Sequence, residues 1–306
     1  MLKYVISRLL VTLPMVLVVI SLTWALIRLA PGNFYSAEKK LPAAIEKNIN
    51  SRYGRDKPVY VQYFKVLGNV LTGDFGTSLK YQGQSVNQIL WRALPVSAAL
   101  GLAAYMLALL LGVTAGTIAA LKQNSRWDYL AMGLAMFGIS VPNFVLGPLL
   151  VLLFAITLGW LPPARWDGIF SLSAVLPVLT LAAIYTAYIS RLSRFGMLEV
   201  LRSDDIRTAR AKGLSDRVVV LRHALRGGLM PVVSFSGPAL AFLITGTVVV
   251  EKIFALPGLG NYFINANLNR DEPLVLGIVA FISLMILVFN LLVDILYAYL
   301  DPRIRY

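Results

Sequence analysis

The residues whose types and spacing could do chemistry gather in one basic stretch, residues 207–228, which reads RTARAKGLSDRVVVLRHALRGG. It holds six Lys or Arg side chains and a single acid, Asp216. Such a stretch can pair with acids on a partner protein, bind phospholipid headgroups, or set the orientation of a membrane protein. The chain has no Cys and one His, His223, which excludes disulfides, thiolate catalysis, Cys-ligated zinc and a His-cluster metal site.

The rest of the chain has the composition of a membrane protein. Of its 306 residues, 58% are hydrophobic and only 14% are charged, which is more apolar surface than a soluble fold of this size could bury. The net charge of +13 would suggest a nucleic-acid partner in a soluble protein, but here most bases lie between apolar blocks. The sequence therefore predicts an all-α integral membrane protein that has no nucleic acid as a partner.

Six apolar stretches are long enough to cross a bilayer as helices, since each crossing needs about 20 residues. The first is interpreted as a retained anchor, because no cleavage pattern of small residues follows it before Pro31. The third contains Gly138, Pro142 and the pair Gly147-Pro148, so we expect it to tilt or kink. The six expected spans are Leu9–Ile27, Val96–Leu121, Tyr129–Leu158, Ile169–Ser190, Leu229–Val250 and Pro273–Val293.

The Lys and Arg content of the short loops predicts how these spans are oriented. With the N-terminus inside, 15 bases fall on the cytoplasmic side and 4 in the short outside segments. The other 9 lie in the long loop of residues 31–95, where the charge rule is weak. Both termini are therefore predicted to be cytoplasmic.

That long external loop has a pattern of its own. Apolar residues recur at helical spacing and precede the turn-rich run Thr72-Gly73-Asp74-Phe75-Gly76, which predicts a small ordered element. Its Asp-Phe-Gly tripeptide is similar to the magnesium motif of kinases, but the other kinase motifs are missing, so we give it no such role. The periodic residues are Tyr60, Tyr63, Phe64, Leu67 and Leu71.

Two short helices joined at an elbow are expected in the basic inner loop. One runs over residues 206–212 and ends at Gly213, and the other runs over residues 216–226 and is stopped by Gly227-Gly228. On composition alone the elbow needs no role beyond topology, although it could also lie on the membrane surface or insert into a groove of a partner. The candidate N-caps are Ser203, Asp204 or Asp205 for the first helix and Ser215 for the second.

The order of residues in this loop resembles the signature loop of ATP-binding cassette importer permeases. That signature has Glu-Ala-Ala, three further residues and Gly before a second short helix and a Leu-Pro pair. Ala209 and Gly213 match it, whereas Arg207 and Thr208 stand in place of the Glu and the first Ala. Pro231 also comes later than the general pattern places it.

These departures are similar to the peptide and nickel branch of the family, and within it to permeases for oligopeptides. The resemblance extends along the whole chain and implies a type I importer permease with six transmembrane helices. The matching runs are RTARAKGL with RHALR in the inner loop, Arg28-Leu29-Ala30-Pro31-Gly32, Gly73-Asp74-Phe75-Gly76, Ala119-Ala120-Leu121-Lys122-Gln123-Asn124, Val250-Glu251-Lys252-Ile253-Phe254, Leu256-Pro257-Gly258-Leu259-Gly260, Asp301-Pro302-Arg303 and Arg303-Ile304-Arg305-Tyr306.

The resemblance also implies partners and a division of the chain. The partners would be a second homologous permease, two cytoplasmic ATPases and an external peptide-binding protein, in a bacterial inner membrane. The chain has no Gly-Lys dipeptide and thus no P-loop, so ATP and magnesium are expected in the ATPases, with no cofactor bound by this transport subunit itself. The divisions would be a cytoplasmic end and anchor (1–30), an external loop (31–93), a permease domain (94–298) with its coupling loop (203–228), and a cytoplasmic tail (299–306).

Three groups of candidate site residues follow. By resemblance, the first elbow helix is a coupling helix, in which Arg210 and Lys212 pair with acids on an ATPase or with lipid headgroups. Polar residues and a break inside spans point to a translocation path, and the segment after the fifth span is either an external gate or binding-protein contact, or only a surface loop. The groups are Ile206, Ala209, Arg210, Lys212, Gly213 and Leu214 for coupling; Ser140, Pro142, Asn143, Asn290 and Asp294 for the path; and Glu251, Phe254, Pro257 and Gly258 for the gate.

Other classes of function remain as alternatives. A secondary transporter should show internal repeats or ionisable residues at mid-membrane, and the central parts of the second to fifth spans carry no charge. A membrane enzyme should show a catalytic group of side chains in the spans, and the sequence shows no such pattern. Within the family, a permease for dipeptides or nickel is the closest alternative.

Overall fold

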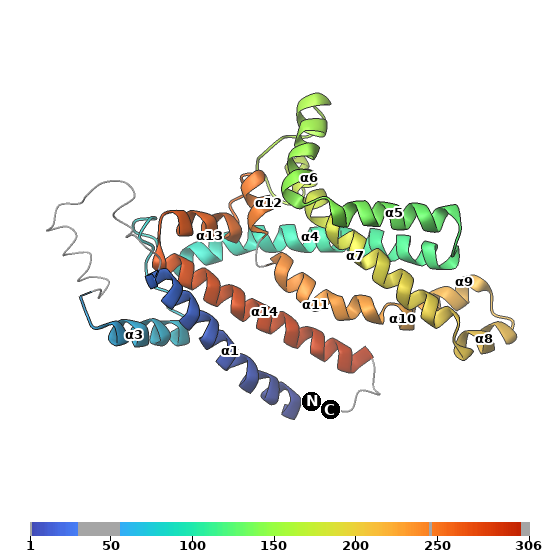
Figure 1. The fold of residues 1–306 in the computed structure, drawn as a ribbon, viewed down its shortest axis with the longest axis horizontal. Helices are drawn as coiled ribbons and strands as arrows, with labels where there is room; N and C mark the ends of the chain where they lie inside the picture. The colour runs from blue at the N-terminus through green and yellow to red at the C-terminus, as the bar shows by residue number, and fades with distance from the viewer. Residues whose placement is uncertain (1, 30–55, 245–246, 301–306) are drawn as a thin grey trace.

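The computed structural model describes residues 2–29, 56–244 and 247–300, with side chains described for 14–29, 56–244 and 247–292. Over these residues the chain is helical, apart from loops and one isolated bridge between Thr77 and Ser85. The long helices run side by side, with α1 against α14, α11 between α14 and α4, and α7 against both α4 and α5 (Figure 1). Their bounds are α1 Leu2–Leu29, α4 Val86–Leu121, α5 Arg126–Ser140, α7 Val175–Leu201, α11 Met230–Ile244 and α14 Glu272–Leu300.

The expected membrane class is confirmed by the length and apolarity of these helices. Within the described residues four stretches qualify as spans, and a bent pair of helices makes a fifth if it is counted as one. Residues 14–29 form a shorter apolar helix, so the sixth, N-terminal span stays a prediction. The four straight stretches are Val86–Leu121, Leu172–Leu201, Met230–Ile253 and Glu272–Leu292, where the second begins with the short helix η3 (Leu172–Ala174) and the third ends with α12 (Val248–Ile253).

The third expected span is sharply kinked, which confirms the prediction that it tilts or kinks. α5 ends at Ser140, and α6 (Asn143–Leu150) with η2 (Val151–Thr157) leaves at an angle of 104°. Val141 and Pro142 between them have extended backbone, because proline lacks an N–H and disfavours helical backbone in the residue before it. The α6–η2 segment consequently projects away from the bundle (Figure 1).

Two span boundaries differ from the sequence expectation. α4 begins at Val86 and not at Val96, because Ser85 and Gln88 form a capping box that starts the helix within the expected external loop. The added turns are buried against α13 (Leu259–Leu268) and the start of α14. α7 likewise continues past Ser190 to Leu201, so both helices extend beyond the apolar residues that predicted them.

Small residues allow α4 to lie close to its neighbours. A Cβ at Gly101 would overlap the backbone carbonyl of Leu243 on α11. A Cβ at Gly116 would overlap the carbonyl oxygen of Ser190 and lie 2.6 Å from Ser193 Cβ on α7. Close helix contact through small residues is a common way to stabilise helix pairs in membranes, where lipid is as apolar as the side chains.

We therefore expect Gly116→Ala to destabilise the α4–α7 pair. The backbone of one helix must shift to admit the methyl group, at a cost of about 1–3 kcal/mol. The measurement is the thermal unfolding midpoint of the purified transporter in detergent. Gly133→Ala on α5 is the control, since a Cβ there meets nothing within 4 Å; equal midpoints for the two variants would contradict the close packing.

The described part of the loop that the sequence predicts to be external forms a small cap on one end of the bundle (Figure 1). The helix predicted over residues 60–71 is confirmed as α3 (Val59–Thr72), and Gly73 ends it in left-handed backbone with φ +72°. Asp271 then fixes the following loop to the bundle by accepting hydrogen bonds from the Ser78 hydroxyl and from the Leu79 and Lys80 amides. The rest of the expected loop, residues 31–55, lies outside the described residues.

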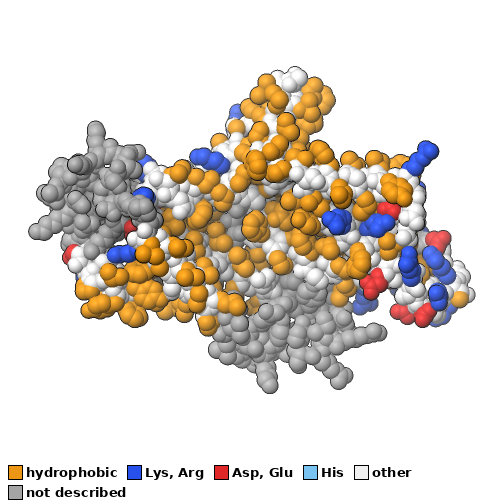
Figure 2. Space-filling model, viewed as in Figure 1, with side chains coloured by type: hydrophobic (Ala, Val, Ile, Leu, Met, Phe, Trp, Pro, Cys, Tyr) orange, Lys and Arg blue, Asp and Glu red, His pale blue; other side chains and the backbone are white. Residues whose placement is uncertain are grey.

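Apolar side chains cover the sides of the bundle, and charged ones gather near its ends. Figure 2 shows hydrophobic atoms over most of the visible flank, with blue and red side chains concentrated around the end that carries α8 and α9. Many large apolar residues are exposed, among them Leu110, Phe137 and Ile156. Such a surface suits lipid rather than water.

Candidate coupling and translocation sites

The basic inner loop forms the expected elbow at the end of α7. α8 (Asp204–Ala211) is the first helix, and the chain turns away from it at Gly213, which has left-handed backbone with φ +78°. The second part comprises α9 (Asp216–Val218), η4 (Val219–Ala224) and α10 (Leu225–Gly228). The elbow lies at the opposite end of the molecule from α13 and the cap (Figure 1).

One face of α8 anchors the elbow to the bundle. Ile206 is 1% exposed and Ala209 is 5% exposed, and both belong to an apolar cluster with Met197, Val219 and Ala224. These two candidate coupling residues therefore pack inside this chain. They can fix the position of α8, but their side chains do not form its outer surface.

The other four candidate coupling residues lie on the outer face of the elbow. Arg210, Lys212, Gly213 and Leu214 are exposed, so this face is available to a partner. Arg210 Nε lies 3.4 Å from Asp216 Oδ1, so the charge of Arg210 also ties α8 to α9. Exposed ion pairs of this kind contribute roughly 0–1 kcal/mol, and the buried apolar face is the main anchor.

The second part of the elbow ends at Gly228, where the pair Gly227-Gly228 predicted a stop, although both glycines are still helical in α10. α11 begins two residues later at Met230. A Cβ at Gly228 would lie 2.6 Å from Met197 Sδ, and one at Gly196 would overlap the Gly228 carbonyl. Gly196 and Gly228 therefore also let α10 lie close to α7, a packing role that the sequence did not predict.

A buried ion pair near the elbow was not predicted. Arg194 on α7 donates from Nε and Nη2 to the two carboxylate oxygens of Asp128 on α5, both at 2.7 Å. The Asn124 amide also donates to Asp128 Oδ2 at 2.9 Å. From the sequence, Arg194 counted only as a topology signal, and the 66 residues between the partners leave no local pattern that pairs them.

We expect Arg194→Ala to destabilise the inner end of the bundle by about 3 kcal/mol, because it leaves the Asp128 carboxylate, 4% exposed, without its partner. The measurement is thermal unfolding of the purified transporter. Asp128→Asn combined with Arg194→Gln should recover part of the loss, since no buried charge is then left alone. Arg191→Ala, at an exposed position of the same helix, is the control; a loss as large there would contradict the account.

The residues expected to line a translocation path occupy two parts of the structure. Ser140, Pro142 and Asn143 lie at the break between α5 and α6, where Ser140 Oγ donates to the Met136 carbonyl at 2.8 Å. Asn143 Oδ1 is buried and lacks a hydrogen-bond partner among the described residues. Asn290 is exposed on α14, and the side chain of Asp294 lies outside the described residues. Their role in a path stays a prediction.

Most residues expected at the external gate are turned inward. Glu251 has no exposed surface, Phe254 is 1% exposed and Gly258 is buried, whereas Pro257 is exposed. Any direct contact of the first three with an external protein would require this segment to open. Their role at a gate stays a prediction.

The Glu251 carboxylate instead joins three helices. Ser97 of α4 donates to Oε1 at 2.7 Å, and the backbone amides of Gly260 and Asn261 in α13 donate to Oε2 at 2.8 and 3.2 Å. Ser97 Oγ also accepts from the Leu259 amide at 2.8 Å. We call this network, formed by Glu251, Ser97 and residues 259–261, the outer clasp. Sequence reasoning identified Glu251 but missed Ser97.

The described residues contain no group of three or more His, Asp or Glu side chains placed to hold a metal ion. The described residues form an apolar helical bundle with a broken span, the outer clasp at one end and the elbow at the other (Figure 1). These features define a multi-pass membrane protein of the permease class. The chain belongs to the family described as binding-protein-dependent transport system inner membrane component, which matches residues 112–306.

Relatives that match over the full length are named as peptide permeases. The chain is 49% identical over 306 residues to the oligopeptide transport system permease protein OppB of Haemophilus influenzae and 48% identical to that of Escherichia coli, with 100% of each chain covered. It is 42% identical over 305 residues to the dipeptide transport system permease protein DppB of Bacillus subtilis, covering 100% of this chain and 98% of the relative.

Solved structures support the type I importer permease fold. A chain of the MetNI methionine ABC transporter in an inward-facing conformation aligns with a TM-score of 0.60. The alignment covers 70% of this chain and 97% of the other at 13% sequence identity, so it shows the fold alone.

Proposed function

We propose that this chain is the permease subunit of an ATP-driven importer and that, with a second permease, it forms the membrane path for oligopeptides. The observation that carries the proposal is the full-length similarity, 49% identity, to a permease named for oligopeptide transport. A permease of this family works with an external binding protein that delivers the substrate. The substrate class is therefore also a property of that partner.

ATP and magnesium act in two separate ATPase subunits on the cytoplasmic side. The exposed face of the elbow, with Lys212, Gly213 and Leu214, docks into an ATPase. Because Ile206 and Ala209 are buried against α7 and η4, a displacement of the docked elbow moves the inner ends of the spans with it. ATP binding then favours an outward-open arrangement through the difference in docking free energy between two states of the bundle.

This arrangement places the elbow and both termini in the cytoplasm. The support is the distribution of bases, 15 of which lie in the segments that this topology puts inside. The cap and the outer clasp are then on the opposite side, where the binding protein delivers its substrate. The break at Ser140–Asn143 interrupts the helix within an apolar span and carries two polar side chains there, which supports a place on the path. A route for oligopeptides should be wide and weakly selective, because transport requires release as well as entry.

Reconstitution tests this function directly. The chain, its companion permease, the ATPases and the binding protein are placed in vesicles, and ATP-dependent uptake is measured for labelled peptides of two to eight residues and for nickel. We expect uptake of the longer peptides that requires all components. Uptake by this chain alone would contradict the proposal and indicate a secondary transporter.

A dipeptide permease is the second candidate, and the 42% identity to a dipeptide permease over the full length favours keeping it. The same peptide series distinguishes the two functions. If the binding protein accepts longer peptides but only dipeptides are taken up, the permeases restrict the length of the transported peptide.

A further inference from the structure

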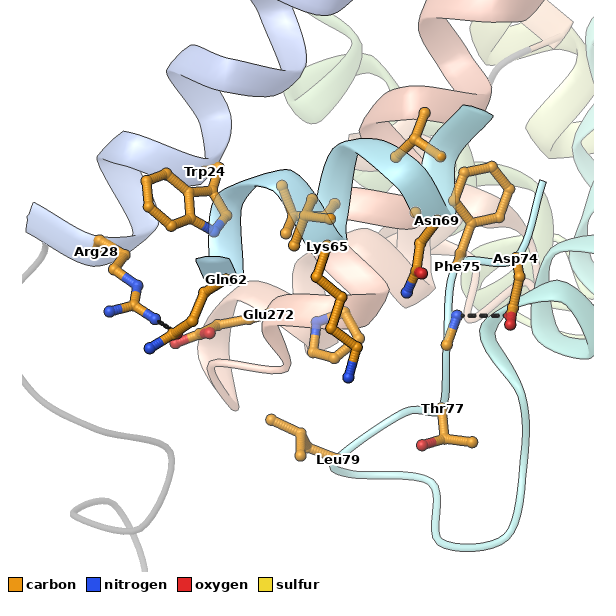
Figure 3. Close-up of a pocket in the computed structure, with 16 residues that line it drawn as sticks. Trp24, Arg28, Gln62, Lys65, Asn69, Asp74, Phe75, Thr77, Leu79 and Glu272 are labelled. Atoms are coloured by element: carbon orange, nitrogen blue, oxygen red, sulfur yellow. Dashed lines mark hydrogen bonds between the residues drawn. The ribbon is translucent and has the colours of Figure 1, made fainter. Parts of the chain in front are cut away.

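A cavity of about 450 Å³ lies between the external cap and the bundle. Four segments surround it: the end of α1, α3, the loop of residues 74–79 and the start of α14 (Figure 3). It lies apart from the elbow and from the break at Ser140–Asn143. None of the site residues predicted from the sequence lines it.

The walls of this cavity are fixed to one another, so it is a built feature and not a gap between loose parts. Asp271, at the start of α14, holds the loop through the Leu79 and Lys80 amides at 3.0 and 3.1 Å. Tyr63 of α3 shares a hydrogen bond of 2.7 Å with Ser21 of α1, and its ring lies 5.2 Å from that of Trp24. These contacts fix the positions of the cap, α1 and α14 relative to one another.

The cavity presents an unpaired cation next to apolar surface. Lys65 extends its ammonium group into the cavity (Figure 3) and has no hydrogen-bond or ion-pair partner among the described residues. Arg28, by contrast, donates to the Gln62 side chain and lies over the Trp24 ring, with Cζ 5.2 Å from its centroid. The apolar part of the lining includes Trp24, Val66, Val70, Phe75, Pro273 and Leu276.

Two acids, Asp74 and Glu272, stand in the same lining, so both signs of charge face one space. Asp74 Oδ1 accepts a hydrogen bond from the backbone amide of Gly76 at 3.0 Å. A ligand that carries a phosphate and an ammonium group together would pair with Lys65 and with Asp74 at once.

The depth of the cavity indicates where such a ligand comes from. Trp24 and Arg28 lie where the apolar helix α1 ends, and the apolar run of α14 begins at Pro273. Trp and Arg at the ends of spans mark the level of lipid headgroups. The cavity thus lies near the level at which a phospholipid has its phosphate, at the end of two apolar helices.

We propose that this cavity binds the headgroup of a zwitterionic phospholipid, with the phosphate on Lys65 and the ammonium group beside Asp74. A bound lipid would fill the space between cap and spans and hold the cap at its observed angle. The proposal does not depend on the identity of the transported substrate.

Native mass spectrometry of the whole transporter, taken from nanodiscs of phosphatidylethanolamine and phosphatidylglycerol, tests the site. We expect retained phosphatidylethanolamine in the wild type and about five-fold less in Lys65→Ala, since one basic side chain near a phosphate contributes about 1 kcal/mol. Lys65→Arg should retain the lipid because it keeps the charge. Lys57→Ala, an exposed lysine of the same cap outside the cavity, is the matched control.

Equal lipid retention in Lys65→Ala and Lys57→Ala would overturn the proposal. So would displacement of the retained lipid by excess transported peptide, which would assign the cavity to substrate. Retention of phosphatidylglycerol in place of phosphatidylethanolamine would also contradict the pairing of an ammonium group with the acids. Uptake assays on the same variants test the transport function separately. Lipid retention and peptide uptake are different measurements, so one proposal can fail while the other stands.

Discussion

Gly213→Val should leave the transporter assembled and able to hydrolyse ATP, yet reduce peptide uptake about ten-fold. Gly213 has a φ of +78°, and a β-branched residue there is strained by roughly 1–2 kcal/mol. A Cβ at this position meets nothing within 4 Å, so the substitution does not disturb packing. The strain instead changes the direction in which the chain leaves α8, which alters the docking face of the elbow.

The measurement is the ratio of peptide taken up to ATP hydrolysed in reconstituted vesicles. A loss of about 1.4 kcal/mol in coupling free energy corresponds to the ten-fold change. Gly213→Pro should act in the same direction, because proline cannot adopt a positive φ. Gly213→Asn is the control, since asparagine tolerates left-handed backbone. Wild-type uptake in Gly213→Val would refute the role of the elbow in coupling.

Substitutions in α8 and at Gly213, which follows it, should have different effects. Ile206 and Ala209 hold the helix on the bundle, so substitutions there should reduce stability before they reduce coupling. Substitution of Gly213 should do the reverse. The two outcomes separate the anchoring residues of the eight-residue helix α8 from Gly213, which follows that helix.

Local signals in the sequence predicted the local structure. The cap helix α3 and the elbow with its left-handed Gly213 both follow from the spacing of apolar residues and from one terminal glycine. Such signals depend on only a few neighbouring residues, so they predict local structure even when the fold of the rest of the chain is unknown. The same reasoning missed the close contact of Gly228 with α7, because a glycine required for close helix contact looks identical in sequence to one that ends a helix.

Contacts between distant residues could not be predicted in this way. Asp128 pairs with Arg194 across 66 residues, Ser97 with Glu251 across 154, and Ser78 with Asp271 across 193. Each depends on which helices become neighbours, and periodicity does not specify that. The cavity beside Lys65 is likewise formed by four segments that are separated in the sequence.

Glu251 illustrates how burial changes the interpretation of a residue type. Because Glu251 follows an apolar run, the sequence indicates a residue of the surface or of a gate. In the structure it has no exposed surface, and its two carboxylate oxygens accept three hydrogen bonds from α4 and α13. Gly258 leaves room for this group, because a Cβ there would overlap Glu251 Oε2 and lie 2.6 Å from Ser97 Oγ. The outer clasp therefore fixes how α12 and α13 pack on the bundle.

We expect Glu251→Ala to release this end of the molecule. The Ser97 hydroxyl and the Gly260 and Asn261 amides would lose their acceptor, and each unsatisfied buried donor costs about 1–3 kcal/mol. A total near 3 kcal/mol corresponds to a rise of roughly a hundred-fold in local opening. Hydrogen exchange of residues 256–262 in the purified transporter measures it, and α8 should exchange as before. Glu251→Gln should show a smaller effect, since its amide oxygen still accepts.

The matched control for the outer clasp is Lys252→Gln, which changes the charge of the neighbouring exposed residue on α12. If exchange of residues 256–262 rises equally in Glu251→Ala and Lys252→Gln, the clasp does not hold this segment. If it rises only in Glu251→Ala, uptake in the same variants then determines whether the segment moves during transport. A gate that opens by breaking the clasp predicts altered transport in Glu251→Gln as well, because the amide keeps the shape of the side chain but weakens the bonds that must break and re-form.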